Sequence, residues 1–166
     1  MANNIREIIT MAVIAKGKKR SKNKYSFEAT GISKVLGCWV CNHRYSATIQ
    51  DDDPQVVGTY DLHIWYSDND GNDSSLLKKQ ISYVDHMDVV NKENRAFSED
   101  DEIEVTCREL PKCIKVSNTD SEITVEIEKE MAIRVIGRAS ILVETKNDRE
   151  TWEEVDDINF DEDFVK

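Results

Sequence analysis

The sequence predicts an all-β protein, a single antiparallel β-sandwich of immunoglobulin-like style with an extended N-terminal strand and an acidic C-terminal tail. Apolar residues recur at every second position in several runs, which is the period of a strand with one buried face. Turn residues separate these runs at spacings typical of sandwiches, and a helical period of 3.6 residues occurs only weakly, in the tail. We expect a β-sandwich assembly domain over 1–146, including the N-terminal strand and a basic loop, followed by a tail over 147–166.

The expected strands follow from this alternation and from their β-branched residues. The opening strand, 5–15, is apolar on both faces, so we expect neighbours to cover each side of it. The last strand carries Gly137, where we expect a break or a bulge. The further strands are predicted at 35–49, 56–66, 76–84, 103–107, 113–117, 122–128 and 133–143.

Turn chemistry marks the connections between these strands. The segment 68–72 reads Asp-Asn-Asp-Gly-Asn and predicts a hairpin loop, in which Asn or Gly supplies positive φ. The segments 51–54 and 117–120 predict turns for the same reason. Leu110-Pro111-Lys112 predicts a turn between two cysteines.

Charge is segregated along the chain, which has 22 basic and 33 acidic residues and a formal net charge of −11. The run 16–24 holds six basic residues and no acid, whereas 147–166 holds nine acids and two basic residues. Two interpretations stay open: a solvated loop with a frayed terminus, or opposite charges that favour head-to-tail association of identical subunits. The negative charge of the whole chain disfavours a nucleic-acid partner.

The tail and the N-terminus carry two further expectations. Aromatic residues lie among the acids of the tail and suit docking to a partner, because such side chains dominate interface energies; they are Trp152, Phe160 and Phe164. The longest apolar run, 11–15, is far short of the ~18 residues of a membrane span. No leader peptide is visible, so we expect cytoplasmic synthesis and no membrane insertion.

The four cysteines are Cys38, Cys41, Cys107 and Cys113. A four-thiolate zinc site is disfavoured, because residues three apart on a strand point to opposite faces. A redox or nucleophilic site lacks a helix start and an orienting acid. We therefore expect no catalytic residue, no metal and no cofactor. Two interpretations remain: small buried apolar side chains, or cross-links between subunits or across the turn at 110–112 once the surroundings become oxidising.

Several blocks in order resemble the CotE family of spore outer-coat morphogenetic proteins. They are REIIT at 6–10, AVIAKGK at 12–18, LGCWV at 36–40, NHRY at 42–45, GTYDLHIWYS at 58–67 and LPKC at 110–113. The resemblance implies a non-enzymatic protein that is made in the mother-cell cytoplasm and then resides in the coat on the spore surface. It also implies self-assembly into a layer or fibre, docking on an inner coat scaffold and recruitment of other coat proteins.

Two sets of residues are candidates for these contacts. Extended backbone with open edges can pair between copies of one chain, and the self-assembly candidates are Ile5, Ile9, Val13, Lys18, Lys19 and Arg20. The alternative function is a β-sandwich binding module that displays aromatic rings to a glycan or peptide. Its candidate residues are Trp39, Tyr45 and Trp65.

Overall fold

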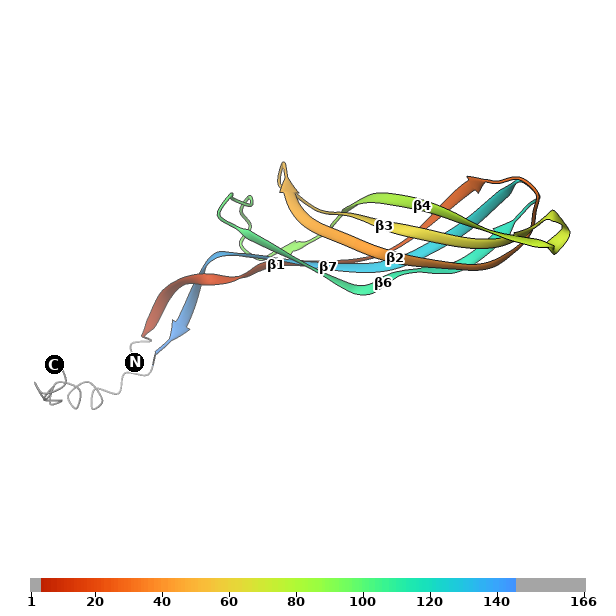
Figure 1. The fold of residues 1–166 in the computed structure, drawn as a ribbon. Coiled ribbons are helices and arrows are strands. Elements are labelled where there is room, and N and C mark those ends of the chain that lie inside the picture. Colours follow the sequence, from red (N-terminus) through yellow and green to blue (C-terminus); the bar gives the residue numbers. More distant parts are fainter. Residues whose placement is uncertain (1–3, 146–166) are drawn as a thin grey trace, which may run out of the picture. The chain divides into compact units, whose positions relative to one another are not determined.

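The structure, a computed structural model, describes residues 4–145 and confirms the predicted fold class: two antiparallel sheets of four and three strands in a sandwich-like arrangement (Figure 1). The elements in chain order are β1 (Ile5–Glu28), β2 (Ile32–Gln50), β3 (Asp53–Asp68), the 3-10 turn η1 (Asn69–Gly71), β4 (Asp73–His86), β5 (Val90–Asn91), β6 (Glu102–Asn118) and β7 (Glu122–Glu144).

The three-stranded sheet has one central strand, β3, and the four-stranded sheet has two, β1 and β7. The three-stranded sheet has the order β2-β3-β4, and the four-stranded sheet has the order β5-β1-β7-β6. Strands β3 and β4 pair without a register shift, whereas β2 and β6 contain several irregularities along their pairings. The strand β5 is short and pairs with β1 only at Ala15 and Lys16.

The chain divides into two units. The first, residues 11–138, contains the sandwich. The second comprises residues 1–10 and 139–166, and its described part is a ribbon of two strands, the start of β1 and the end of β7. In this ribbon the Thr145 amide donates to the Asn4 carbonyl at 2.8 Å, and Ser140 Oγ donates to Glu7 Oε1 at 2.6 Å.

The core lies between the central strands of the two sheets, where neighbours on both sides complete the burial of every second side chain. On β3 the buried residues follow the predicted alternation: Val56, Tyr60, Leu62 and Ile64. On β7 the same pattern runs through Ile123, Val125, Ile127, Met131, Ile133 and Val135. Gly58 interrupts the β3 row because the ring of Tyr83 occupies the space of a side chain there.

One ion pair crosses this apolar core. Lys129 occupies an inward position of β7, is 2% exposed, and places Nζ 3.0 Å from Oδ2 of the buried Asp85 on β4. Lys129 Nζ also donates to Ser21 Oγ at 2.7 Å and lies 4.1 Å from the centre of the Tyr83 ring. Removal of either charge would leave the other buried without its counterion, which is costly in a low-dielectric interior.

The predicted turns are confirmed except at 110–112. Asp51 and Asp52 adopt positive φ between β2 and β3, and the loop between β3 and β4 has positive φ at Asn69, Asp70 and Gly71. The turn predicted at 110–112 is wrong, because these residues lie inside β6. Proline is tolerated there because β6 is an edge strand with irregular pairing around this position.

Three other expectations are also corrected. The basic run 16–24 is part of the strand β1 and not a loop, because its Lys and Arg residues suit the solvent face and the edge of a sheet. The expected strands 122–128 and 133–143 are one strand, β7, which continues through Gly137. The opening strand is not covered on both sides, because residues 5–11 are exposed.

The buried ion pair yields a prediction for stability. Lys129→Met should lower the free energy of unfolding by about 3–5 kcal/mol, because Asp85 stays buried without a counterion. The double variant K129M/D85L should recover most of that loss, and urea unfolding followed by far-UV circular dichroism measures both. The control is Glu104→Gln, which breaks an exposed ion pair with Arg134 and should cost less than about 1 kcal/mol. An equal loss in the control and in Lys129→Met would contradict the prediction.

Candidate functional site

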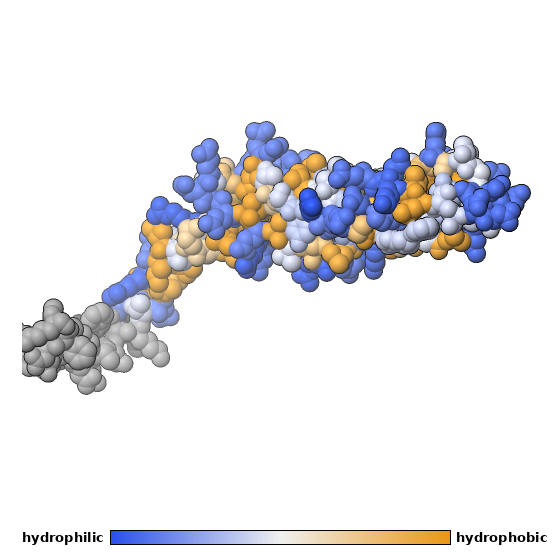
Figure 2. All heavy atoms as spheres, in the orientation of Figure 1, coloured by the Kyte–Doolittle hydropathy of each residue, from blue (hydrophilic) through white to orange (hydrophobic). Residues whose placement is uncertain are grey.

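The two-stranded ribbon carries exposed apolar side chains on both faces. Ile8 and Ile9 are neighbours on β1, as are Ile141 and Leu142 on β7, so each pair points to opposite faces. Ile9 is 61% exposed and Leu142 is 71% exposed. Figure 2 shows apolar surface over the start of β1 and the end of β7. A ribbon of only two strands is marginally stable in water by itself, so these side chains form a surface suited to a covering partner.

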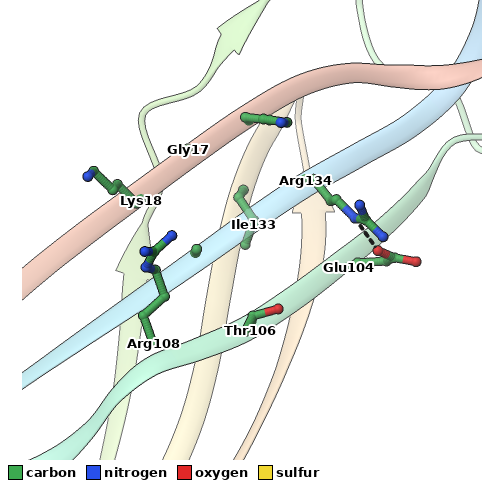
Figure 3. A pocket seen from close by; sticks show the side chains of 9 residues that line it. Gly17, Lys18, Glu104, Thr106, Arg108, Ile133 and Arg134 are labelled. Carbon is green, nitrogen blue, oxygen red and sulfur yellow. Dashed lines mark hydrogen bonds and ion pairs between the residues drawn. The ribbon is translucent and has the colours of Figure 1, made fainter.

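The second surface is a shallow groove on the outer face of the four-stranded sheet (Figure 3), with a volume of about 380 Å³. Its floor lies where the small residue Ala132 on β7 pairs with Thr106 on β6. Lys18 from β1 and Arg108 from β6 line the groove, and Figure 3 shows Arg108 reaching from β6 toward β7. The other charged residues that line it are Lys16, Glu104 and Arg134.

The groove has an excess of positive charge. Glu104 is paired with Arg134, as the dashed line in Figure 3 indicates. Arg108 Nε lies 3.9 Å from Glu130 Oε2, so Lys16 and Lys18 are the two of the four cations that form no ion pair among the described residues. Ala132 adds little bulk to the floor, and the cations therefore stand around an open hollow. Such an arrangement suits the carboxylates of an acidic peptide.

The three basic residues predicted to take part in self-assembly, Lys18, Lys19 and Arg20, have different surroundings in the structure. Lys18 lines the groove. Lys19 Nζ donates to the His86 carbonyl at 3.2 Å. Arg20 donates two hydrogen bonds of 2.8 Å to Glu109 and one of 3.0 Å to Glu128. These carboxylates raise the pKa of Arg20 further above its usual range, and they already occupy its guanidinium within the chain.

The apolar members of the set also separate. Ile5 and Ile9 are exposed in the ribbon, whereas Val13 is half-buried beside Val90 in a small pocket of the sandwich unit. The docking candidates Trp152, Phe160 and Phe164 lie outside the described residues, as does the boundary predicted at 146/147.

The four cysteines are free thiols, and the structure distributes them among different neighbours. Cys41 lies 3.7 Å from Nε2 of His63. Cys107 lies 3.9 Å from Nδ1 of His43. Cys38 interacts with Cys113, and burial followed by this contact raises the pKa of Cys38 well above its usual range.

The geometry of β6 rules out one predicted cross-link. Cys107 and Cys113 do not flank a turn, because both lie in β6. Six residues of extended chain span roughly 20 Å, and the local irregularities of β6 shorten this only in part. A disulfide needs Cα atoms within about 7 Å, so a bond between these two cysteines of one chain is excluded.

Metal-binding side chains do not converge in the part of the chain that the structure describes. Across residues 4–145, no group of three or more His, Cys, Asp or Glu side chains could hold a metal ion. His43 Nε2 lies 2.7 Å from the Tyr83 hydroxyl, and burial together with the charge of Lys129 lowers the pKa of His43. This histidine therefore belongs to the polar network around the buried ion pair. Among the described residues, no helix is long and apolar enough to cross a membrane.

The structure brings together two of the three aromatic candidates, Trp39 and Trp65, and places Tyr45 elsewhere on β2. Trp39 and Trp65 stack on the outer face of the three-stranded sheet, with ring centres 6.4 Å apart and an interplanar angle of 28°. Trp39 is 45% exposed, and the ring of His63 meets it edge-on. Tyr45 is exposed as well but contacts His43, which in turn contacts the buried Tyr83.

Comparison with known protein families shows the family to which the chain belongs. Residues 4–166 match the family described as outer spore coat protein E (CotE), which is nearly the whole chain. The chain belongs to the CotE family. The resemblance of the sequence blocks is thereby confirmed. Neither the curated proteins nor the solved structures contain a match.

Membership of the CotE family sets the biological context. CotE proteins are structural proteins of the spore outer coat and are not known as enzymes. The chain is therefore a spore outer-coat protein that resides in the spore coat, and other coat components are its expected neighbours.

Several residues of these surfaces escaped the sequence reasoning. Arg108 and Arg134 are single basic residues on separate strands, and only cross-strand pairing brings them to the groove. Leu142 follows Ile141 directly, and this break in the alternation is a signal that could have been noticed. Lys129 was also missed, although it stands at the inward position between Ile127 and Met131.

Proposed function

We propose that this CotE-family protein is a non-enzymatic structural protein that self-assembles into a layer or fibre of the spore outer coat and recruits other coat proteins. The observation that carries the proposal is the ribbon with apolar side chains exposed on both faces. Burial of one such side chain stabilises an association by about 1.5–3 kcal/mol. A second copy of the chain is the occupant that we propose, because a coat protein packs in many copies and the ribbon can cover itself by symmetry.

The basic groove supplies a second contact of the same assembly. In this proposal the acidic segment 147–166 of one copy binds the groove of the next, with carboxylates beside Lys18 and Arg108. Head-to-tail contacts of this kind repeat from copy to copy and produce chains or rings. Charge complementarity makes this contact sensitive to salt, whereas the apolar ribbon contact is less so.

Recruitment of other coat proteins, and docking on an inner coat scaffold, are assigned to the aromatic residues of the same tail. Trp152, Phe160 and Phe164 are separated by acids, and aromatic side chains are the usual anchors of peptide–protein contacts. Assembly before oxidation follows from synthesis in the mother-cell cytoplasm, where thiols stay reduced.

A second candidate function is favoured by the stacked, partly exposed tryptophans. Trp39 and Trp65 offer flat apolar surface with a polar N–H at its margin. A glycan or an extended peptide could pack on that surface, as in a binding module.

The ribbon yields the test of the first proposal. Leu142→Lys should weaken self-association roughly tenfold or more, because it removes apolar burial and places a charge in the interface. The matched control is Leu110→Lys on β6, since Leu110 is 69% exposed and Leu142 is 71% exposed. Sedimentation velocity over a concentration series measures both. Equal association of the two variants, or a wild-type chain that stays monomeric at tens of micromolar, would count against the proposal.

The groove yields a test of the tail contact. A labelled peptide of residues 147–166 should bind the full chain in low salt and lose affinity as salt rises. Arg108→Glu should weaken this binding roughly tenfold, as read by fluorescence anisotropy, because a cation in the groove becomes an anion. Lys34→Glu on β2 makes the same charge change outside the groove and serves as the control. If both variants bind the peptide alike, the tail does not use the groove.

The aromatic surface yields the test of the alternative function. A chitin-type oligosaccharide should shift the tryptophan fluorescence of the wild-type chain if the stacked rings bind sugar, and Trp39→Ala should abolish that shift. Trp152→Phe is the control because it removes the one tryptophan that is not part of the stacked pair. Without a shift in the wild-type chain up to millimolar oligosaccharide, sugar binding is rejected.

A further inference from the structure

Cys38 and Cys113 belong to strands at the edges of different sheets. Cys38 lies on β2, the outer strand of the three-stranded sheet, and Cys113 lies on β6, the outer strand of the four-stranded sheet. Both thiols are partly buried and pack against the same hydrophobic core. Cα atoms of β2 and β6 come within 8 Å of each other, which is closer than the ~10 Å that usually separates two packed sheets.

Contacts between the two strands fix their relative direction. Cys107 Sγ lies 3.9 Å from His43 Nδ1, and the Phe97 amide, just before β6, donates to Asp52 Oδ1, just after β2, at 2.7 Å. From His43 to Asp52 the residue number rises along β2, whereas that of the contacting residue falls from Cys107 to Phe97. The two strands therefore run antiparallel. Cys38 is five residues before His43, and Cys113 is six residues after Cys107.

This spacing brings the two thiols together. Both strands carry irregularities in the intervals concerned, between Cys41 and Arg44 on β2 and between Cys107 and Lys112 on β6. These irregularities shorten both strands, so the interval from Cys38 to His43 and the interval from Cys107 to Cys113 have similar lengths along the strands. The Cys113 side chain is accordingly the neighbour that interacts with the Cys38 thiol.

We propose that Cys38 and Cys113 of one chain form a disulfide that links the two sheets along their shared β2–β6 side, with a small-molecule disulfide such as oxidised glutathione as oxidant. The Cys113 thiolate attacks one glutathione sulfur, forms a mixed disulfide and releases one glutathione. Cys38 then gives its proton to water, attacks the Cys113 sulfur and releases the second glutathione. Two protein thiols are oxidised and one glutathione disulfide is reduced to two thiols.

The order of these steps follows from the surroundings of the thiols. Both thiols are partly buried, and Cys113 Sγ donates to the Lys115 carbonyl at 3.6 Å. Burial raises the pKa of Cys38, so this thiol is a poor first nucleophile. It is a competent second one because the mixed disulfide forms next to it.

The other two cysteines are not arranged for this bond. The Cys41 side chain lies on the opposite face of β2 from Cys38, beside His63 on the outside of the sheet. Cys107 lies beside His43 and donates to the Glu109 carbonyl at 3.3 Å. They remain available for contacts between copies, so the bond within one chain is independent of the proposed self-assembly.

The test uses the full chain with two cysteines replaced. The C41S/C107S variant keeps only Cys38 and Cys113, and after incubation with oxidised glutathione we expect it to lose both free thiols and the mass of two hydrogen atoms. Peptide mapping without reductant should show Cys38 joined to Cys113. The matched control C38S/C113S keeps Cys41 and Cys107 and should form no bond within one chain.

Isotope mixing separates a bond within one chain from one between copies. Equal amounts of unlabelled and 15N-labelled C41S/C107S chains are combined before oxidation, and we expect linked peptides that are wholly light or wholly heavy. Unfolding of the oxidised variant in urea should be roughly tenfold slower than after reduction, because the bond joins the two sheets. Light–heavy peptides as the main product, or two free thiols after oxidation, would overturn the proposal.

Discussion

The ion pair between Lys129 and Asp85 constrains the sandwich more than any other single contact. It joins β7 to β4, one strand from each sheet, inside an interior that otherwise consists of apolar side chains. If either strand shifted its register by one residue, its charged side chain and its apolar core side chains would all turn to the solvent face of the sheet. The pair therefore specifies how the two sheets face each other, whether or not it adds net stability.

The two units of the chain differ in how far they bury their apolar side chains. In the sandwich unit the inward positions of the central strands are filled by apolar neighbours and by one paired cation. In the ribbon unit two strands expose apolar side chains on both faces. In this CotE-family protein the exposed apolar side chains of the ribbon are the observation on which the proposed self-association rests.

Features that depend on the local sequence pattern, such as strand positions, could be predicted. Features that depend on which strands pair in a sheet could not. The alternation from Val56 to Ile64 marks β3 and its buried face because burial on one side of a strand leaves a period of two. Pro111 was taken for a turn because its lack of an N–H is local information, whereas its place on an edge strand is not. The groove could not be predicted for the same reason: Lys18 and Arg108 are ninety positions apart and meet only through the sheet order.

Pro111 also bears on the polarity of any growing array. It sits in β6, the outer strand on one side of the four-stranded sheet, where β2 of the other sheet lies nearby, and it has no backbone N–H. On the opposite side β5 pairs with β1 only at Ala15 and Lys16, so β5 covers only a short part of that border. Extension of this sheet by further strands would thus be one-sided, and a filament built in this way would have two unlike ends.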